Sequence, residues 1–164
     1  MAGSVTVALL VTVTDPVAAA VAVALVPAGL LAADIDTATL RLPDPLTLGC
    51  YRPVAVIEVG GALLDGQYDR LPVAAALSAL CLLALAIPAW FGMVGFGDVK
   101  LAGLLGLAVG RLGPSAVVLF LLIGHLIGGG LALRALRRGS GHRSRVPFGP
   151  ALLVGGATAM ALCG

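Results

Sequence analysis

Long apolar stretches, separated by short polar breaks, run along almost the whole chain and constrain its fold more than any other feature. Of the 164 residues, 60% are hydrophobic and 11% are charged, and the mean hydropathy is +1.10. A soluble domain typically carries about 25% charged residues, and this chain has too few polar side chains to cover a globule with polar surface. The composition therefore predicts an all-α, polytopic membrane bundle.

The apolar stretches predict about six transmembrane segments in one domain over residues 1–164. A spanning helix needs roughly 20 mostly apolar residues. The candidate segments are 16–33, 46–64, 71–91, 99–110, 114–136 and 151–163. The fourth is short, about 18 Å by helical rise, and we expect it to begin inside the bundle. Residues 34–45 are polar and contain two prolines, so we expect no spanning helix there. Whether residues 5–13 also lie in the membrane stays open.

The basic residues predict the orientation. The stretch after residue 136 is the strongest basic cluster, and the positive-inside rule places it in the cytoplasm. Counting alternate crossings back from this cluster puts eight of the ten Lys and Arg residues on or near the inner side: Arg41, Arg52, Lys100, Arg134, Arg137, Arg138, Arg143 and Arg145. Arg70 and Arg111 fall outside, and Glu58 is expected near the outer boundary. The net charge of +2 is too small to indicate a nucleic-acid partner.

Two acidic positions fall on the same inner face in this topology. One is Asp34 with Asp36, at the end of the first segment, and the other is Asp98, at the start of the fourth. Ionisable residues at membrane depth are costly and commonly functional. Two carboxylates in a partly dehydrated site suit aspartyl-protease chemistry, because burial and mutual repulsion separate their titrations. One carboxylate can then accept a proton from water while the other donates one.

Simpler interpretations of the same residues stay open. Asp98 follows a glycine and could be a helix N-cap, while Asp34, Asp36 and Asp44 could be solvated loop residues. Intramembrane acids also serve ion and proton pathways. Gly95 and Gly97, on either side of Phe96, permit backbone geometry closed to other residues and leave room for an extended substrate backbone.

Three motifs resemble those of one known family, the type IV prepilin peptidases, which are GxGD intramembrane aspartyl proteases. GFGDVK at 95–100 resembles their GxGDxK motif. DIDTATLRLPDPLT at 34–47 resembles their first-aspartate motif, with Asp36 seven residues before Pro43. VPFGPAL at 146–152 resembles the Pro-Phe-Gly-Pro stretch that opens a late helix. The motifs occur in the family's order, which is a far more specific signal than GxGD alone.

The resemblance implies that Asp36 and Asp98 form the catalytic pair of an aspartic endopeptidase. Asp34 is the alternative first aspartate, but it is out of register with Pro43. Gly95, Gly97 and Lys100 match the second motif, and with Pro43 and Asp34 of the first motif they are the implied motif or substrate-binding positions. Lys100 could instead contact lipid phosphate or be a lysine that snorkels to the interface. The implied reaction removes the basic leader peptide of prepilins or pseudopilins at the cytoplasmic face of the cell membrane, with no metal and no cofactor. The oligomeric state stays open.

One departure from the family narrows the expected activity. Many members carry an N-terminal extension with paired CxxC motifs and also methylate the new amino terminus. The three cysteines of this chain form no CxxC, so we expect peptidase activity without methyltransferase activity. Two other classes stay possible on the residues alone: a small transporter or channel with buried acids, and a non-catalytic membrane subunit of a pilus or secretion assembly.

Overall fold

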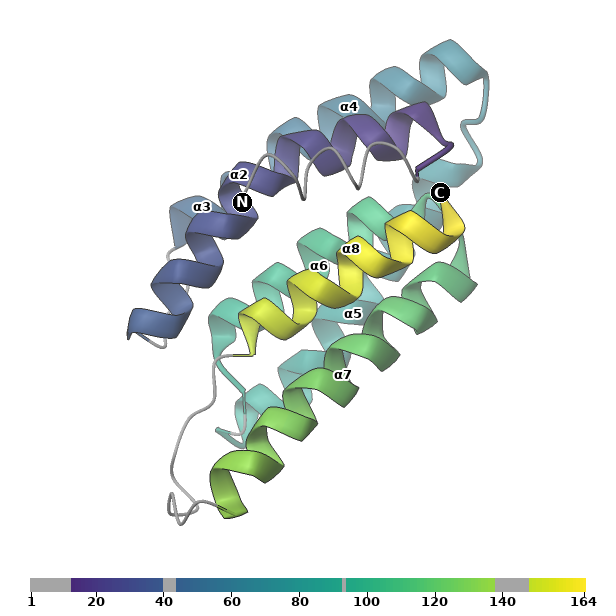
Figure 1. Cartoon of the computed structure of the whole chain (residues 1–164). Helices are drawn as coiled ribbons and strands as arrows, with labels where there is room; N and C mark the ends of the chain where they lie inside the picture. The colour runs from purple at the N-terminus through teal and green to yellow at the C-terminus, as the bar shows by residue number, and fades with distance from the viewer. Residues whose placement is uncertain (1–12, 40–43, 93, 138–147) are drawn as a thin grey trace.

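The chain folds into a bundle of α-helices (Figure 1). The structure, a computed structural model, describes residues 13–39, 44–92, 94–137 and 148–164. These contain seven helices and no strand: α2 (Pro16–Thr39), α3 (Asp44–Leu48), α4 (Tyr51–Asp65), α5 (Arg70–Trp90), α6 (Phe96–Gly110), α7 (Pro114–Arg137) and α8 (Gly149–Cys163). The predicted all-α membrane bundle is confirmed.

Within the described ranges, four stretches are long and apolar enough to cross a membrane: Pro16–Thr39, Asp44–Asp65, Arg70–Trp90 and Pro114–Ala135. The second stretch combines α3 and α4, which are separated by a turn at Gly49 and Cys50. Helices α6 and α8 have 15 residues each, about 22 Å by helical rise, so neither spans a bilayer of roughly 30 Å without help. The chain is a multi-pass membrane protein.

Helix α6 is the centre of the bundle and packs against all six other described helices. Figure 1 shows α6 and α8 side by side, with α2 and α4 on one side of them and α7 on the other. Most of α6 is buried around its full circumference, including Val99, Leu104 and Val109. A helix that is apolar on every face is stable only where neighbours surround it, and this explains how so short a segment holds its place.

The closest pairing, between α5 and α6, depends on small residues. A side chain at Gly106 would meet Cys81 Sγ at 2.8 Å, and one at Gly110 would meet the backbone of Ala74 at 2.9 Å. Ser78 Oγ also donates a hydrogen bond to the carbonyl oxygen of Gly103 at 2.7 Å. Small residues let helix backbones approach in lipid, so α6 and α5 form a tight pair.

The first helix continues further than the sequence predicted. The polar stretch was expected to start at Asp34, but α2 runs on to Thr39. Thr37 Oγ1 and Thr39 Oγ1 donate hydrogen bonds to the carbonyl oxygens of Asp34 and Ile35, at 2.9 and 2.8 Å. Polar side chains that bond back to the helix let it continue out of the apolar region. Pro43, most of the 5–13 stretch and the basic cluster beyond Arg137 lie outside the described residues.

Candidate active site

Asp36 lies in the last turns of α2, and its side chain faces the interior. The residue is 4% exposed, and its Oδ2 accepts a hydrogen bond from the backbone N–H of Gly149 at 3.1 Å. Gly149 is the first residue of α8, and helix N-termini have unsatisfied N–H groups that favour an anion. Asp34, two residues earlier, is exposed. Residues at i and i+2 do not share a helix face, so only Asp36 reaches the bundle interior.

Asp98 lies in the first turn of α6 and is 6% exposed. Its Oδ2 accepts a hydrogen bond from the N–H of Gly95 at 3.3 Å. Its Oδ1 is buried and meets no hydrogen-bond partner in the part of the chain that the structure describes. The simple N-cap interpretation is wrong, because Gly95 occupies the N-cap and Asp98 is three residues further on.

The role expected for Gly95 also differs in the structure. Its φ of −74° is an ordinary extended value that any residue adopts, so unusual backbone geometry is not what requires glycine here. A Cβ at Gly95 would lie 3.2 Å from Asp98 Oδ2, which is tight. Glycine therefore leaves space for the Asp98 carboxylate to turn back onto the start of its own helix.

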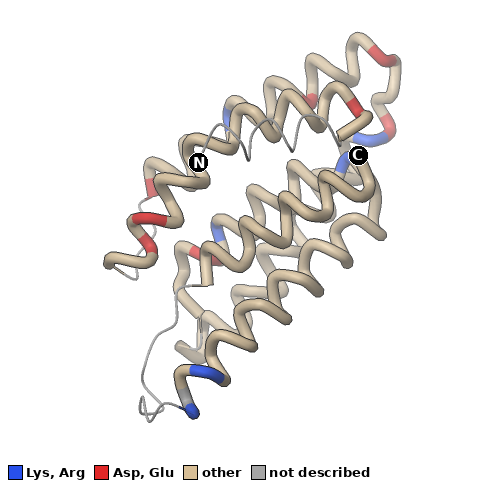
Figure 2. The backbone as a smooth tube through the Cα atoms, in the orientation of Figure 1, with Lys and Arg blue, Asp and Glu red and all other residues tan. Residues whose placement is uncertain are grey.

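Asp36 and Asp98 come to the same end of the bundle, as the sequence predicted. They are close enough for their charges to repel each other. Figure 2 shows the acidic residues of α2, α3 and α6 gathered at this end, with a second group of charges at the opposite end. Two carboxylates from different helices thus face a common, largely dehydrated region, where one can hold a proton while the other is ionised.

The Lys100 side chain forms an ion pair that the sequence did not predict. Its Nζ pairs with Asp44 Oδ1, on α3, at 2.5 Å. The Lys100 carbonyl oxygen accepts a hydrogen bond from Tyr51 Oη at 2.9 Å. Lys100 therefore connects α6 to both α3 and α4 beside Asp98. The sequence showed an aspartate at position 44 within the first motif, but its pattern did not indicate which basic side chain pairs with it.

An apolar groove of about 250 Å³ runs along the bundle between α2 and α8. One face of α2 lines it from Ala22 to Ala33, α8 lines the other side from Pro150 to Met160, and Leu105 of α6 also contributes. Ala33 lies one turn before Asp36, and Pro150 follows Gly149, the hydrogen-bond donor to Asp36. The groove therefore extends along α2 for about 16 Å by helical rise, and its lining ends one turn before Asp36.

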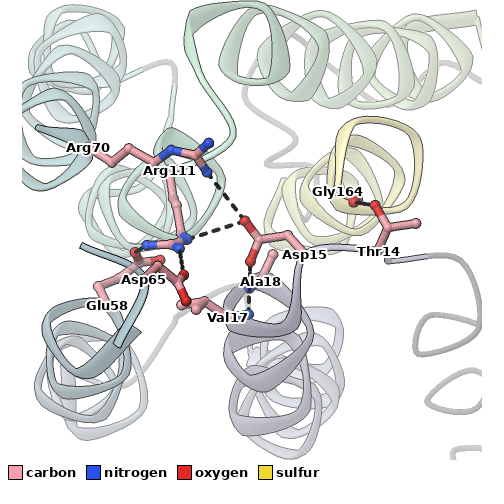
Figure 3. Close-up of polar contacts among 9 residues, drawn as sticks. All are labelled: Thr14, Asp15, Val17, Ala18, Glu58, Asp65, Arg70, Arg111 and Gly164. Carbon is pink, nitrogen blue, oxygen red and sulfur yellow. Dashed lines mark hydrogen bonds and ion pairs between the residues drawn. The ribbon is translucent and has the colours of Figure 1, made fainter. Parts of the chain in front are cut away.

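The opposite end of the bundle holds a charge cluster that the sequence analysis missed (Figure 3). Arg111, 3% exposed, follows α6 and pairs through Nη2 with Asp65 (2.7 Å), through Nε with Asp15 (3.3 Å) and through Nη1 with Glu58 (3.8 Å). Asp15 also pairs with Arg70 at 3.5 Å. The predicted topology had placed Arg70, Arg111 and Glu58 toward the same, outer side of the membrane. Hydropathy does not indicate which helices pack together, so the sequence did not predict that these side chains form ion pairs.

No group of three or more His, Cys, Asp or Glu side chains among the described residues has a geometry that could hold a metal ion. The candidate site offers two carboxylates and the neighbouring backbone N–H groups of Gly95 and Gly149.

The fold and these side chains define a multi-pass membrane protein with two buried carboxylates at one end of its helical bundle. The model of the type IV leader peptidase family matches residues 23–133, more than half of the chain, including both carboxylates. The chain belongs to this family, and the resemblance predicted from its motifs is confirmed. The match ends before the third motif, at 146–152. No curated protein and no solved structure matches the chain.

Proposed function

We propose that the protein is an aspartic endopeptidase in which Asp36 and Asp98 are the catalytic pair. The observation that carries this proposal is that two buried carboxylates, from α2 and α6, lie at the same end of a bundle whose family is that of leader peptidases. The ionised carboxylate takes a proton from water, whose oxygen attacks the scissile carbonyl carbon. The protonated carboxylate donates to the carbonyl oxygen. The C–N bond then breaks, and the leaving nitrogen takes up a proton.

Both carboxylates accept a backbone N–H at the N-terminus of a helix, Asp36 from Gly149 and Asp98 from Gly95, where the helix dipole favours an anion. Asp98 Oδ1 is buried without a hydrogen-bond partner among the described residues, so it can bond to a water molecule or substrate group that enters the site.

The substrate we propose is a prepilin-like protein, with a basic leader before the cleaved bond and an apolar helix after it. The groove between α2 and α8 has an apolar lining that ends one turn before Asp36, so it matches the segment after the cut. The acidic residues near the site suit the basic leader. We propose that the site faces the cytoplasm, because Arg52, Lys100, Arg134 and Arg137 lie toward its end of the bundle, as the positive-inside rule requires.

The test is cleavage of a synthetic prepilin-like peptide by the purified protein in detergent, followed by mass spectrometry of the products. Asp36→Asn and Asp98→Asn should each abolish cleavage and leave the helical circular dichroism and the size-exclusion profile unchanged. Asp34→Asn is the matched control, because it removes the same charge from the exposed face of the same turn and should retain activity. Cleavage that survives both Asp36→Asn and Asp98→Asn would overturn the proposal. Loss in Asp34→Asn alone would reassign the first aspartate.

A further inference from the structure

The ion pair between Lys100 and Asp44 lies beside the candidate site and is open to solvent. Lys100 is two residues after Asp98 on α6, and Asp44 begins α3. The Asp44 side chain is 62% exposed and that of Lys100 is 32% exposed. Ion pairs this open to solvent contribute little to stability, so the pair can separate at small cost without disturbing the helices that carry it.

Both partners are held by contacts other than the ion pair. The Lys100 backbone is fixed by the hydrogen bond from Tyr51 Oη, at 2.9 Å. Helix α3 is held by Thr47, which is 1% exposed against the bundle. Separation of the pair therefore requires only rotation of the Lys100 side chain. That movement would leave the Asp44 carboxylate facing solvent on the same side of the bundle as Asp98.

We propose that Asp44 is the binding subsite for a positively charged residue of the substrate leader, and that Lys100 occupies this subsite when no substrate is bound. The pairing itself shows that the Asp44 carboxylate can hold an ammonium group at hydrogen-bonding distance. A leader Lys or Arg would make the same contact and displace Lys100. This inference rests on the proposed peptidase function and adds a recognition element outside the catalytic pair.

The two partners of the pair should then have opposite effects on substrate affinity. Asp44→Asn removes the subsite and should raise KM for a peptide with a lysine-containing leader. Lys100→Met removes the competing internal cation and should lower KM. Each change should be about two- to fivefold at low salt, the range expected of a partly exposed ion pair. Both changes in KM should become smaller at high ionic strength, where exposed charges are screened.

The assay measures steady-state cleavage of two peptides, each with an apolar segment of about 20 residues. One has lysines in its leader and the other has glutamines at the same positions. The KM effects of both variants should disappear with the glutamine peptide. Arg137→Met and Asp69→Asn are matched charge controls: Arg137→Met removes a positive charge from the end of α7, and Asp69→Asn removes a negative charge from the far end of the bundle.

Several outcomes would overturn the inference while leaving the peptidase proposal intact. If both variants lower stability or kcat together and leave KM unchanged, the pair is only a link between α3 and α6. A rise in KM for Lys100→Met would mean that Lys100 itself binds substrate. Equal effects with the lysine and glutamine peptides would remove the leader from the explanation. Absence of cleavage by the wild-type protein is a different result, and it would refute the proposed function instead.

Discussion

Replacement of Arg111 by methionine should destabilise the protein strongly, although this residue lies far from the candidate site. The guanidinium is buried, with a side-chain exposure of 1%, and Glu58 beside it has 3%. Breaking a buried ion pair by removing one partner typically costs about 3–5 kcal/mol, because the remaining charge is left uncompensated. Asp65 is 32% exposed and can turn to water, so its contact adds little. We therefore expect the free energy of unfolding to fall by about 3 kcal/mol.

The double variant Arg111→Met with Glu58→Leu tests the physical reason for this loss. If the cost arises from an isolated buried carboxylate, removal of that carboxylate should restore at least half of the lost stability, since apolar replacements of buried ion pairs are often neutral. Arg70→Met is the control, because its side chain is 40% exposed and its loss should cost less than about 1 kcal/mol.

The measurement is equilibrium unfolding in mixed micelles of a mild non-ionic detergent and increasing SDS, followed by helical circular dichroism. The midpoints and slopes of the four proteins, including wild type, give the differences in free energy of unfolding. A value for Arg111→Met within about 1 kcal/mol of wild type would contradict the assignment of a desolvated charge cluster. A double variant no more stable than Arg111→Met would show that the uncompensated Glu58 charge is not the cause.

Three further predictions use the same preparations. Gly110→Ala should lower the free energy of unfolding by about 1–3 kcal/mol, because its Cβ would meet the Ala74 backbone at 2.9 Å. Gly130→Ala, where nothing lies within 4 Å, should leave the free energy of unfolding unchanged or raise it. Equal melting temperatures for the two variants would contradict the close pairing of α5 and α6. Gly29→Leu should fill the groove and raise KM severalfold, unlike Gly60→Leu on an open face; unchanged cleavage kinetics would remove the groove from substrate binding. The pH profile of kcat/KM should be bell-shaped, because one carboxylate must be ionised and the other protonated; a profile that falls on one side only would contradict a working pair.

Hydropathy and motif spacing predicted most of the fold and both candidate carboxylates. Apolar stretches of about 20 residues report which segments lie in lipid, and the basic residues report their direction. The end of α2 was missed, because threonines that bond to their own helix resemble loop residues in the sequence. Neither signal says which helices pack together. The Gly149–Asp36 and Lys100–Asp44 contacts join residues 113 and 56 positions apart, and such contacts depend on packing that no local pattern encodes.

Helix α6 has a charged residue at each end, Arg111 in a structural ion-pair cluster and Asp98 in the candidate catalytic pair. The helix is about 22 Å long, too short for a bilayer of roughly 30 Å, so a charge at either end is buried, at Asp98 on one side and Arg111 on the other. Arg111 is surrounded by three carboxylates that offset its burial. Asp98 accepts one hydrogen bond at 3.3 Å, and its other oxygen meets no partner in the described ranges.

A buried polar atom without a partner is costly, and native structures keep such atoms mainly where they serve a function. At one end of α6 the Arg111 charge pairs with three carboxylates, although Arg111 Nη1 and Glu58 Oε1 are also buried without a hydrogen bond, while at the other end no described cation pairs with Asp98. That contrast favours Asp98 as a group that acts on water or substrate over a role in holding the helices together. Asp98→Asn should therefore leave the free energy of unfolding near that of wild type while cleavage is lost, the reverse of the outcome expected for Arg111→Met.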